Sequence, residues 1–221
     1  MQFSQNDKFY SSLIGHQFSS LIDHVRWFSA FIVLVGHARA QLFVAYDGVM
    51  NRSIYVSLLY FVSNLQNEAV ICFFVVSGIL VGGKLLEYSA ELQFPIKRYL
   101  IERMTRVFIV LIPAIIFSFL PYGFGACGNH DAALLPLSLV MFQEITQGGS
   151  MCNVPLWSLT SEMWYYVIGL LIVLTAKRNV FSLLMLFACV ALLSLDEYDA
   201  HNVLLYFPIW CGGLIIYLRW E

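Results

Sequence analysis

The chain has 221 residues, of which 60% are hydrophobic and only 12% are charged, and its formal net charge is -2. Soluble proteins carry about 25% charged residues, so this chain has too few polar side chains to cover a water-facing surface. Its 18 Phe, 12 Tyr and 5 Trp exclude disorder. The near-neutral charge, without a basic aromatic face, argues against nucleic acid as a partner. The composition predicts an all-α polytopic membrane helical bundle in the lipid bilayer.

Six apolar windows are long enough, or nearly long enough, to cross a membrane as helices. They cover residues 27 to about 46, about 69–83 (beginning a few residues earlier, so as to include Glu68), 107–125, about 155–176, 180–195 and 202–218. Two further apolar stretches are short for a span. Residues 53–62 lie in the membrane interface or form the outer turn of the second span, and residues 132–141 are a re-entrant or surface segment. We expect one transmembrane domain over residues 1–221, with about six helices.

The distribution of Lys and Arg predicts the orientation of these spans. Ten of the 12 basic residues fall on one side, and the other side receives only Arg39 and Arg52. The loops at residues 126–154 and 196–201 hold no Lys or Arg. Because positively charged loops stay in the cytoplasm, both termini are predicted to be cytoplasmic, in a multi-pass protein of the cytoplasmic (inner) membrane.

The first window carries two ionisable residues, Arg26 and His37, that are costly inside a membrane. Eleven residues at 100° each make three turns plus 20°, so both residues share one helix face, about 16 Å apart along the axis. With Arg26 at the cytoplasmic edge, His37 lies near the middle of the membrane. A neutral imidazole there can act as a general base. The alternative is a packing histidine that bonds to a neighbouring backbone.

A basic cluster at residues 96–106 directly precedes the third window. Arg103 and Arg106 are three positions apart, so they share a helix face and could clamp phosphate groups through their forked donors. The alternative is that such a cluster only sets the topology or touches anionic lipid.

A carboxylate lies among aromatic residues at the start of the fourth window, where Glu162 falls within residues 157–166. It is placed to orient a histidine or to bind a sugar. The alternative is an aromatic interfacial belt in which the glutamate reaches toward water.

The cysteines indicate no metal or haem site, because no spacing among them fits one. Cys72, Cys189 and Cys211 fall within spans and are predicted to be packing residues. Cys127 and Cys152 both fall in the predicted outer loop, where a disulfide is chemically allowed and its formation stays open.

Four motifs, in this order, resemble those of the membrane acyltransferase-3 family. They are Arg26 followed after ten residues by His37, Phe73-Phe74 with Ser77-Gly78 and with Ile79 in place of the usual Phe, Arg103 with Arg106, and Leu156-Trp157-Ser158-Leu159 with Glu162 and Tyr165. A weaker likeness follows at Phe207-Pro208 and Gly212-Gly213. Each motif is common in apolar sequence, but the four together are specific, and the resemblance covers about residues 23–213.

The resemblance implies transfer of an acyl group, often acetyl, from cytoplasmic acyl-CoA to a hydroxyl of an envelope glycan or lipid-linked sugar. Acyl-CoA is then a co-substrate, and no bound cofactor or metal is expected. The implied catalytic residues are His37 as general base or acyl relay, Arg26 as a donor-holding or orienting residue, and Glu162 as a partner of His37 or of the acceptor. Donor binding is implied for Arg103 and Arg106, with supporting roles for Ser77, Trp157, Ser158 and Tyr165.

Two other functions stay open. A proton-coupled transporter or channel would use His37 and Glu162 as a relay. A catalytically silent truncated member is the other, because members of the family usually continue with several more spans. We therefore expect a form that is short at its C-terminal end relative to the family.

Overall fold

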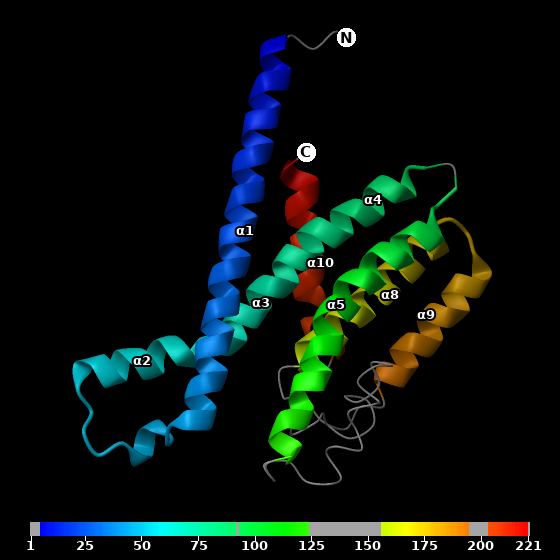
Figure 1. The fold of residues 1–221 in the computed structure, drawn as a ribbon. Coiled ribbons are helices and arrows are strands. Elements are labelled where there is room, and N and C mark those ends of the chain that lie inside the picture. Colours follow the sequence, from blue (N-terminus) through cyan, green and yellow to red (C-terminus); the bar gives the residue numbers. More distant parts are fainter. Residues whose placement is uncertain (1–4, 92, 124–155, 195–202, 221) are drawn as a thin grey trace. The chain divides into compact units, whose positions relative to one another are not determined.

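Helices form wherever the sequence predicts apolar spans. The structure is a computed structural model that describes residues 5–91, 93–123, 156–194 and 203–220, and these ranges contain helices and turns but no strand (Figure 1). Among the described residues, each of the six predicted windows overlaps a helix. The chain divides into two compact units, Met1–Val76 and Ser77–Glu221. The segment predicted at residues 132–141 lies outside the described residues.

The first unit begins with one long helix, and the helices that follow it are shorter. Its elements are α1 (Gln5–Leu42), the 3-10 turn η1 (Tyr46–Gly48), α2 (Ile54–Asn64) and α3 (Gln66–Ser77), whose last residue opens the second unit. The first span was predicted to reach residue 46, but the helix ends at Leu42. The predicted boundary is wrong because the chain turns there, and Tyr46 begins the separate 3-10 turn.

The short apolar stretch at residues 53–62 forms α2. Its first turn is capped by Ser53, whose hydroxyl accepts a hydrogen bond from Val56 N at 3.4 Å. Only Leu65 separates α2 from α3, and one apolar helical run extends over Ile54–Ser89. This finding agrees with the alternative that the stretch belongs to the second span.

Helices α1 and α2 pack against each other, and Gly36 marks their close approach. A Cβ atom at Gly36 would lie 2.7 Å from the Ser63 carbonyl oxygen and 2.5 Å from Gln66 Oε1. Real Cβ atoms do not come that close to other heavy atoms, so a larger side chain would push the two helices apart.

The second unit is built around α8. Its elements are the π-helical turn η2 (Gly78–Gly82), α4 (Gly83–Ser89), α5 (Ile96–Gly123), α8 (Leu156–Ala176), α9 (Val180–Leu193) and α10 (Val203–Trp220). Helix α8 packs against α4, α5, α9 and α10, and its contact with α5 can be followed in Figure 1. Helix α10 packs against η2, where a Cβ at Gly78 would lie 1.9 Å from the Trp210 carbonyl oxygen.

A tight turn joins α8 to α9 and explains why two long apolar helices can follow each other so closely. Arg178 adopts a positive φ of 63°, a left-handed conformation that ends the helix. Asn179 then caps α9, because its side-chain oxygen accepts a hydrogen bond from Ser182 N at 3.3 Å.

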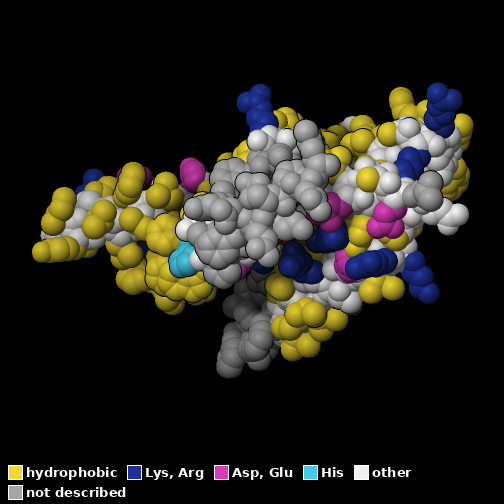
Figure 2. Space-filling model, turned by 90° about the horizontal axis from the view of Figure 1, so that it is seen from above, with side chains coloured by type: hydrophobic (Ala, Val, Ile, Leu, Met, Phe, Trp, Pro, Cys, Tyr) yellow, Lys and Arg dark blue, Asp and Glu magenta, His cyan; other side chains and the backbone are white. Residues whose placement is uncertain are grey.

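The outer faces of the helices are apolar, as a bilayer requires. Gln17–Leu42, Ile54–Ser89 and Leu156–Ala176 are long and apolar enough to cross a membrane, and Val180–Leu193 and Val203–Arg219 are shorter apolar helices. Trp27 in α1 and Phe187 in α9 are 68% and 76% exposed. Figure 2 shows mostly hydrophobic side chains, with most basic and acidic ones gathered next to one another. Such surfaces favour lipid over water.

Candidate active site

Arg26 and His37 lie on one uninterrupted helix, α1, which confirms that they share a face. Arg26 forms a long, exposed ion pair with Asp23, at 3.9 Å. The apolar run begins at Gln17, nine residues before Arg26, and His37 lies five residues, about 8 Å, before the end of α1. The helix thus extends well beyond Arg26 on its N-terminal side. The depths of Arg26 and His37 in the membrane are not tested by the structure and stay predictions.

His37 and His24 have different surroundings. The Nδ1 atom of His24 lies 2.6 Å from the Ser20 carbonyl oxygen, and this exposed ring is held against its own helix. The side chain of His37 is half-buried, and it has no hydrogen-bond partner among the described residues. An imidazole without a partner keeps a nitrogen lone pair that can accept a proton.

A buried polar cluster in the second unit brings Ser77 and Glu162 together. Trp210 Nε1 donates to Ser77 Oγ at 3.3 Å, and the hydroxyl of Tyr166 also interacts with the Ser77 side chain. The same Tyr166 hydroxyl donates to a carboxylate oxygen of Glu162. Tyr166 is therefore the link between two predicted site residues that lie 85 positions apart. Sequence reasoning missed its role, although the four-residue spacing from Glu162 places both on one face of α8.

Arg103 belongs to the same buried region, whereas Arg106 does not. The Arg103 side chain is only 10% exposed, and its guanidinium carbon lies 5.8 Å from the centre of the Tyr99 ring. Tyr99 in turn donates to the Tyr166 carbonyl oxygen at 3.1 Å. The Arg103 Nε atom is buried and has no partner within the described ranges. Arg106 is exposed, so the two arginines of the predicted pair have different environments.

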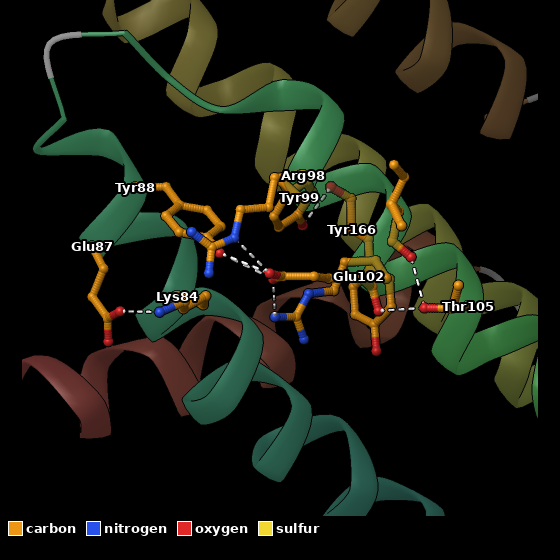
Figure 3. A network of polar contacts seen from close by, with 10 residues as sticks. Lys84, Glu87, Tyr88, Arg98, Tyr99, Glu102, Thr105 and Tyr166 are labelled. Atoms are coloured by element: carbon orange, nitrogen blue, oxygen red, sulfur yellow. Dashed lines mark hydrogen bonds and ion pairs between the residues drawn. The ribbon is translucent and has the colours of Figure 1, made fainter.

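An ionic network next to Arg103 joins α4 to α5 (Figure 3). Glu102 accepts a hydrogen bond from Arg98 Nε at 2.9 Å and from the Tyr88 hydroxyl at 3.0 Å, and its other contact is a 3.8 Å ion pair with Arg103. Lys84 pairs with Glu87 at 2.6 Å. The hydrogen bond from Arg98, helped by the one from Tyr88, holds the pKa of Glu102 below its usual value. Glu102 therefore stays ionised at neutral pH.

The remaining predicted residues of α8 face α10. The Tyr165 hydroxyl donates to the Val203 carbonyl oxygen at 3.0 Å, and the ring is fully buried. The Trp157 ring lies 5.7 Å from that of Tyr206, and Ser158 is half-buried. These contacts of Tyr165 and Trp157 attach α8 to α10 and so support the helix that carries Glu162.

The cysteine predictions are only partly covered. Cys72 is exposed, Cys189 is buried and Cys211 is half-buried, and all three are free thiols. Cys127 and Cys152 lie outside the described residues.

The fold and these polar sites define a helical membrane protein with buried ionisable groups. The acyltransferase domain that defines the acyltransferase-3 family matches residues 20–221. The chain belongs to this family of membrane acyltransferases, and the resemblance seen in the sequence is confirmed. No curated protein and no solved structure matched the chain.

Proposed function

We propose that the protein moves an acyl group, acetyl in the simplest case, from cytoplasmic acyl-CoA to a hydroxyl of an envelope glycan or lipid-linked sugar. The observation that carries this proposal is His37, a half-buried imidazole without a described hydrogen-bond partner on an apolar helix of an acyltransferase-3 chain. An ionisable side chain in such a helix is disfavoured unless it serves function.

The chemistry assigned to His37 is general-base catalysis. Its imidazole takes the proton of the acceptor hydroxyl, and the oxygen attacks the thioester carbonyl carbon. The carbon–sulfur bond then breaks, and the departing CoA thiolate takes the proton back from the imidazolium. General-base assistance of this kind contributes about 10²–10⁴-fold in rate. Relay of the acyl group through the imidazole is the other route that His37 permits.

Donor binding is assigned to Arg103 and Arg106. The buried Nε of Arg103 has no described partner, and an unsatisfied buried donor is unfavourable by about 1–3 kcal/mol. A phosphate oxygen of CoA would satisfy it with a charge-assisted hydrogen bond. Arg106 is exposed three positions further along α5 and can meet a second phosphate from solvent. We assign Arg26 to orienting the donor, and Glu162 to binding acceptor hydroxyls.

The test compares two histidines of α1 by the same substitution. Membranes that contain wild-type protein, the His37→Gln variant or the His24→Gln variant are incubated with radiolabelled acetyl-CoA, and label is counted in the envelope glycan fraction. Glutamine keeps a hydrogen bond but cannot take a proton at neutral pH. His37→Gln should therefore abolish labelling at an unchanged protein level, and His24→Gln should retain it.

Labelling by His37→Gln near the wild-type rate would show that His37 is a packing residue and would overturn the proposed mechanism. Absence of label from wild-type membranes, together with proton flux that depends on His37, would favour the transporter instead.

A further inference from the structure

A cavity of about 460 Å³ lies in the first unit, where the chain turns from α1 into α2. Six residues line it: Arg39, Ala45, Tyr46, Ser57, Tyr60 and Asn64. The lining thus combines one cation, two aromatic rings, a hydroxyl and an amide. A few fixed polar groups between aromatic walls are typical of small-molecule binding sites.

Two arginines stack on the two tyrosines that line this cavity, and of the two only Arg39 is itself a lining residue. The guanidinium carbon of Arg39 lies 5.1 Å from the centre of the Tyr60 ring, and that of Arg52 lies 4.8 Å from the centre of the Tyr46 ring. The two tyrosine rings contact each other, with centres 5.3 Å apart and planes tilted by 54°. The positive charges of Arg39 and Arg52 are therefore held on the two rings of one aromatic pair.

The hydrogen bonds of these arginines leave their charge uncompensated. Arg39 donates from Nε to the Ser63 hydroxyl at 3.2 Å and from Nη2 to the Asn64 amide oxygen at 3.3 Å. Arg52 donates to the backbone oxygen of Asp47 at 3.1 Å. All three acceptors are neutral, and neither arginine pairs with a carboxylate in the described part of the chain. An anion could accept the remaining N–H groups.

Charge distribution gives an independent reason to look for an anion here. Arg39 and Arg52 are the only two of the 12 basic residues that fall on the predicted outer side of the membrane. Basic residues are disfavoured in that position. That these two contact the same pair of rings, although 13 positions apart, is unexpected if each serves only the local fold.

We propose that this cavity binds an acidic saccharide through a phosphate or carboxylate group, with the tyrosine rings packing on the sugar. The link between this cavity and acyl transfer rests on the proposed function. If the bound saccharide is the acceptor, the acceptor is an acidic glycan. His37 precedes Arg39 by two residues, which is 200° around α1, so the cavity is not on the face of His37. It would hold a sugar remote from the reacting hydroxyl and act on acceptor affinity more than on the chemical step.

The test measures binding without turnover. The full chain in nanodiscs of neutral phosphatidylcholine is dialysed to equilibrium against radiolabelled tetragalacturonate or uncharged maltotetraose. Tetragalacturonate should bind, more weakly at high salt because the charges are screened, and maltotetraose should not. Arg39→Lys should raise the Kd for tetragalacturonate about tenfold, the size expected from losing one charge-assisted bond, and Arg52→Gln should raise it by a smaller factor through loss of a nearby positive charge. Arg219→Gln is the matched control at an exposed arginine of α10, and it should bind as wild type does.

Arg52 makes the test robust to misfolding, because its one described hydrogen bond is to a neighbouring backbone oxygen. Equal binding of both saccharides, or a Kd that neither Arg39→Lys nor Arg52→Gln changes, would overturn the proposal. Displacement of tetragalacturonate by nanodiscs containing phosphatidylglycerol would overturn the saccharide assignment in favour of a lipid headgroup. His37→Gln should bind tetragalacturonate normally while losing acyl transfer, so that the two proposals can fail separately.

Discussion

Two groups of cations, one in each unit, are held in different ways. In the second unit Lys84, Arg98 and Arg103 each lie within 4 Å of a carboxylate, and Glu102 serves two of them. At the α1–α2 turn of the first unit, Arg39 and Arg52 lie on tyrosine rings and bond to neutral oxygens. Aromatic rings hold a guanidinium in place without cancelling its charge.

This difference distinguishes cations that the protein pairs with its own carboxylate from cations that it leaves without one. Around Glu102 the protein supplies its own anion, so an incoming phosphate would have to compete with a carboxylate already in place. Around Tyr46 and Tyr60 no described carboxylate forms an ion pair with Arg39 or Arg52, so both guanidinium groups can attract an incoming anion. In the described ionic network of α4 and α5, the Nε of Arg103 is a buried donor that has no hydrogen-bond partner.

The largest expected effect is at Arg103. In Arg103→Met, the KM for acetyl-CoA should rise about 10- to 100-fold, because a charge-assisted bond contributes about 1.5–3 kcal/mol. The melting temperature should stay close to that of wild type, since Glu102 keeps its bonds to Arg98 and Tyr88. Kinetics over a range of acetyl-CoA concentrations would check both points, with the exposed Arg219→Met as control. An unchanged KM for acetyl-CoA would show that Arg103 has only a structural role.

The next largest effect is expected when a carboxylate is added beside Arg39, which would remove the difference between the two groups of cations. The Asn64 oxygen lies 3.3 Å from Arg39 Nη2, so Asn64→Asp would place a negative charge there with little change in shape. The Kd for tetragalacturonate should rise about tenfold, because the cavity would then contain its own counter-ion. Asn64→Ala separates loss of the amide from gain of charge, and it should bind much more tightly than Asn64→Asp. Similar affinities for the two variants would argue against an anion site.

The smallest effect concerns pH and the Glu102 network. Since the folded state holds the pKa of Glu102 below its unfolded value, the carboxylate stabilises the fold above about pH 4.3, and this contribution is lost as the pH falls through the lower folded value. Glu102→Gln should lower the melting temperature at pH 7 by no more than about 4 °C, because the pair is partly exposed. The difference from wild type should shrink below about pH 4, which thermal unfolding in detergent between pH 3 and 7 would measure. If the difference in melting temperature grew as the pH fell, the assigned direction of the pKa shift of Glu102 would be wrong.

Sequence reasoning was most successful for properties set by composition and helical periodicity. The window at residues 155–176 is helix α8, and the shared face of Arg26 and His37 follows from one continuous helix. The end of the first span was placed too late, because residues 43–46 are apolar enough to continue a helix although the chain turns there. Hydropathy carries no information about such a turn.

The sequence alone did not predict which side chains pair between helices. Tyr166 joins Ser77 to Glu162 through packing within the second unit, and no local pattern in the sequence predicts that contact. Likewise, Arg39 and Arg52 contributed only to the prediction of topology, and the fold shows that they lie on two tyrosine rings that contact each other. Long-range contacts of this kind depend on tertiary packing, which helical periodicity does not encode.

The π-helical turn at Gly78–Gly82 has a consequence for insertions and deletions. Such a turn closes its hydrogen bonds one residue later than an α-helix does, so it absorbs one extra residue without ending the helix. A single-residue deletion within Gly78–Gly82 would turn the π-helical turn into a regular α-helical one, so Tyr88 would keep its place beside Glu102. A single-residue deletion within residues 83–87 of α4 has no such turn to absorb it, and it would rotate Tyr88 by about 100°, away from Glu102. Chain length is thus less constrained within the π-helical turn than in the short α-helix that follows it.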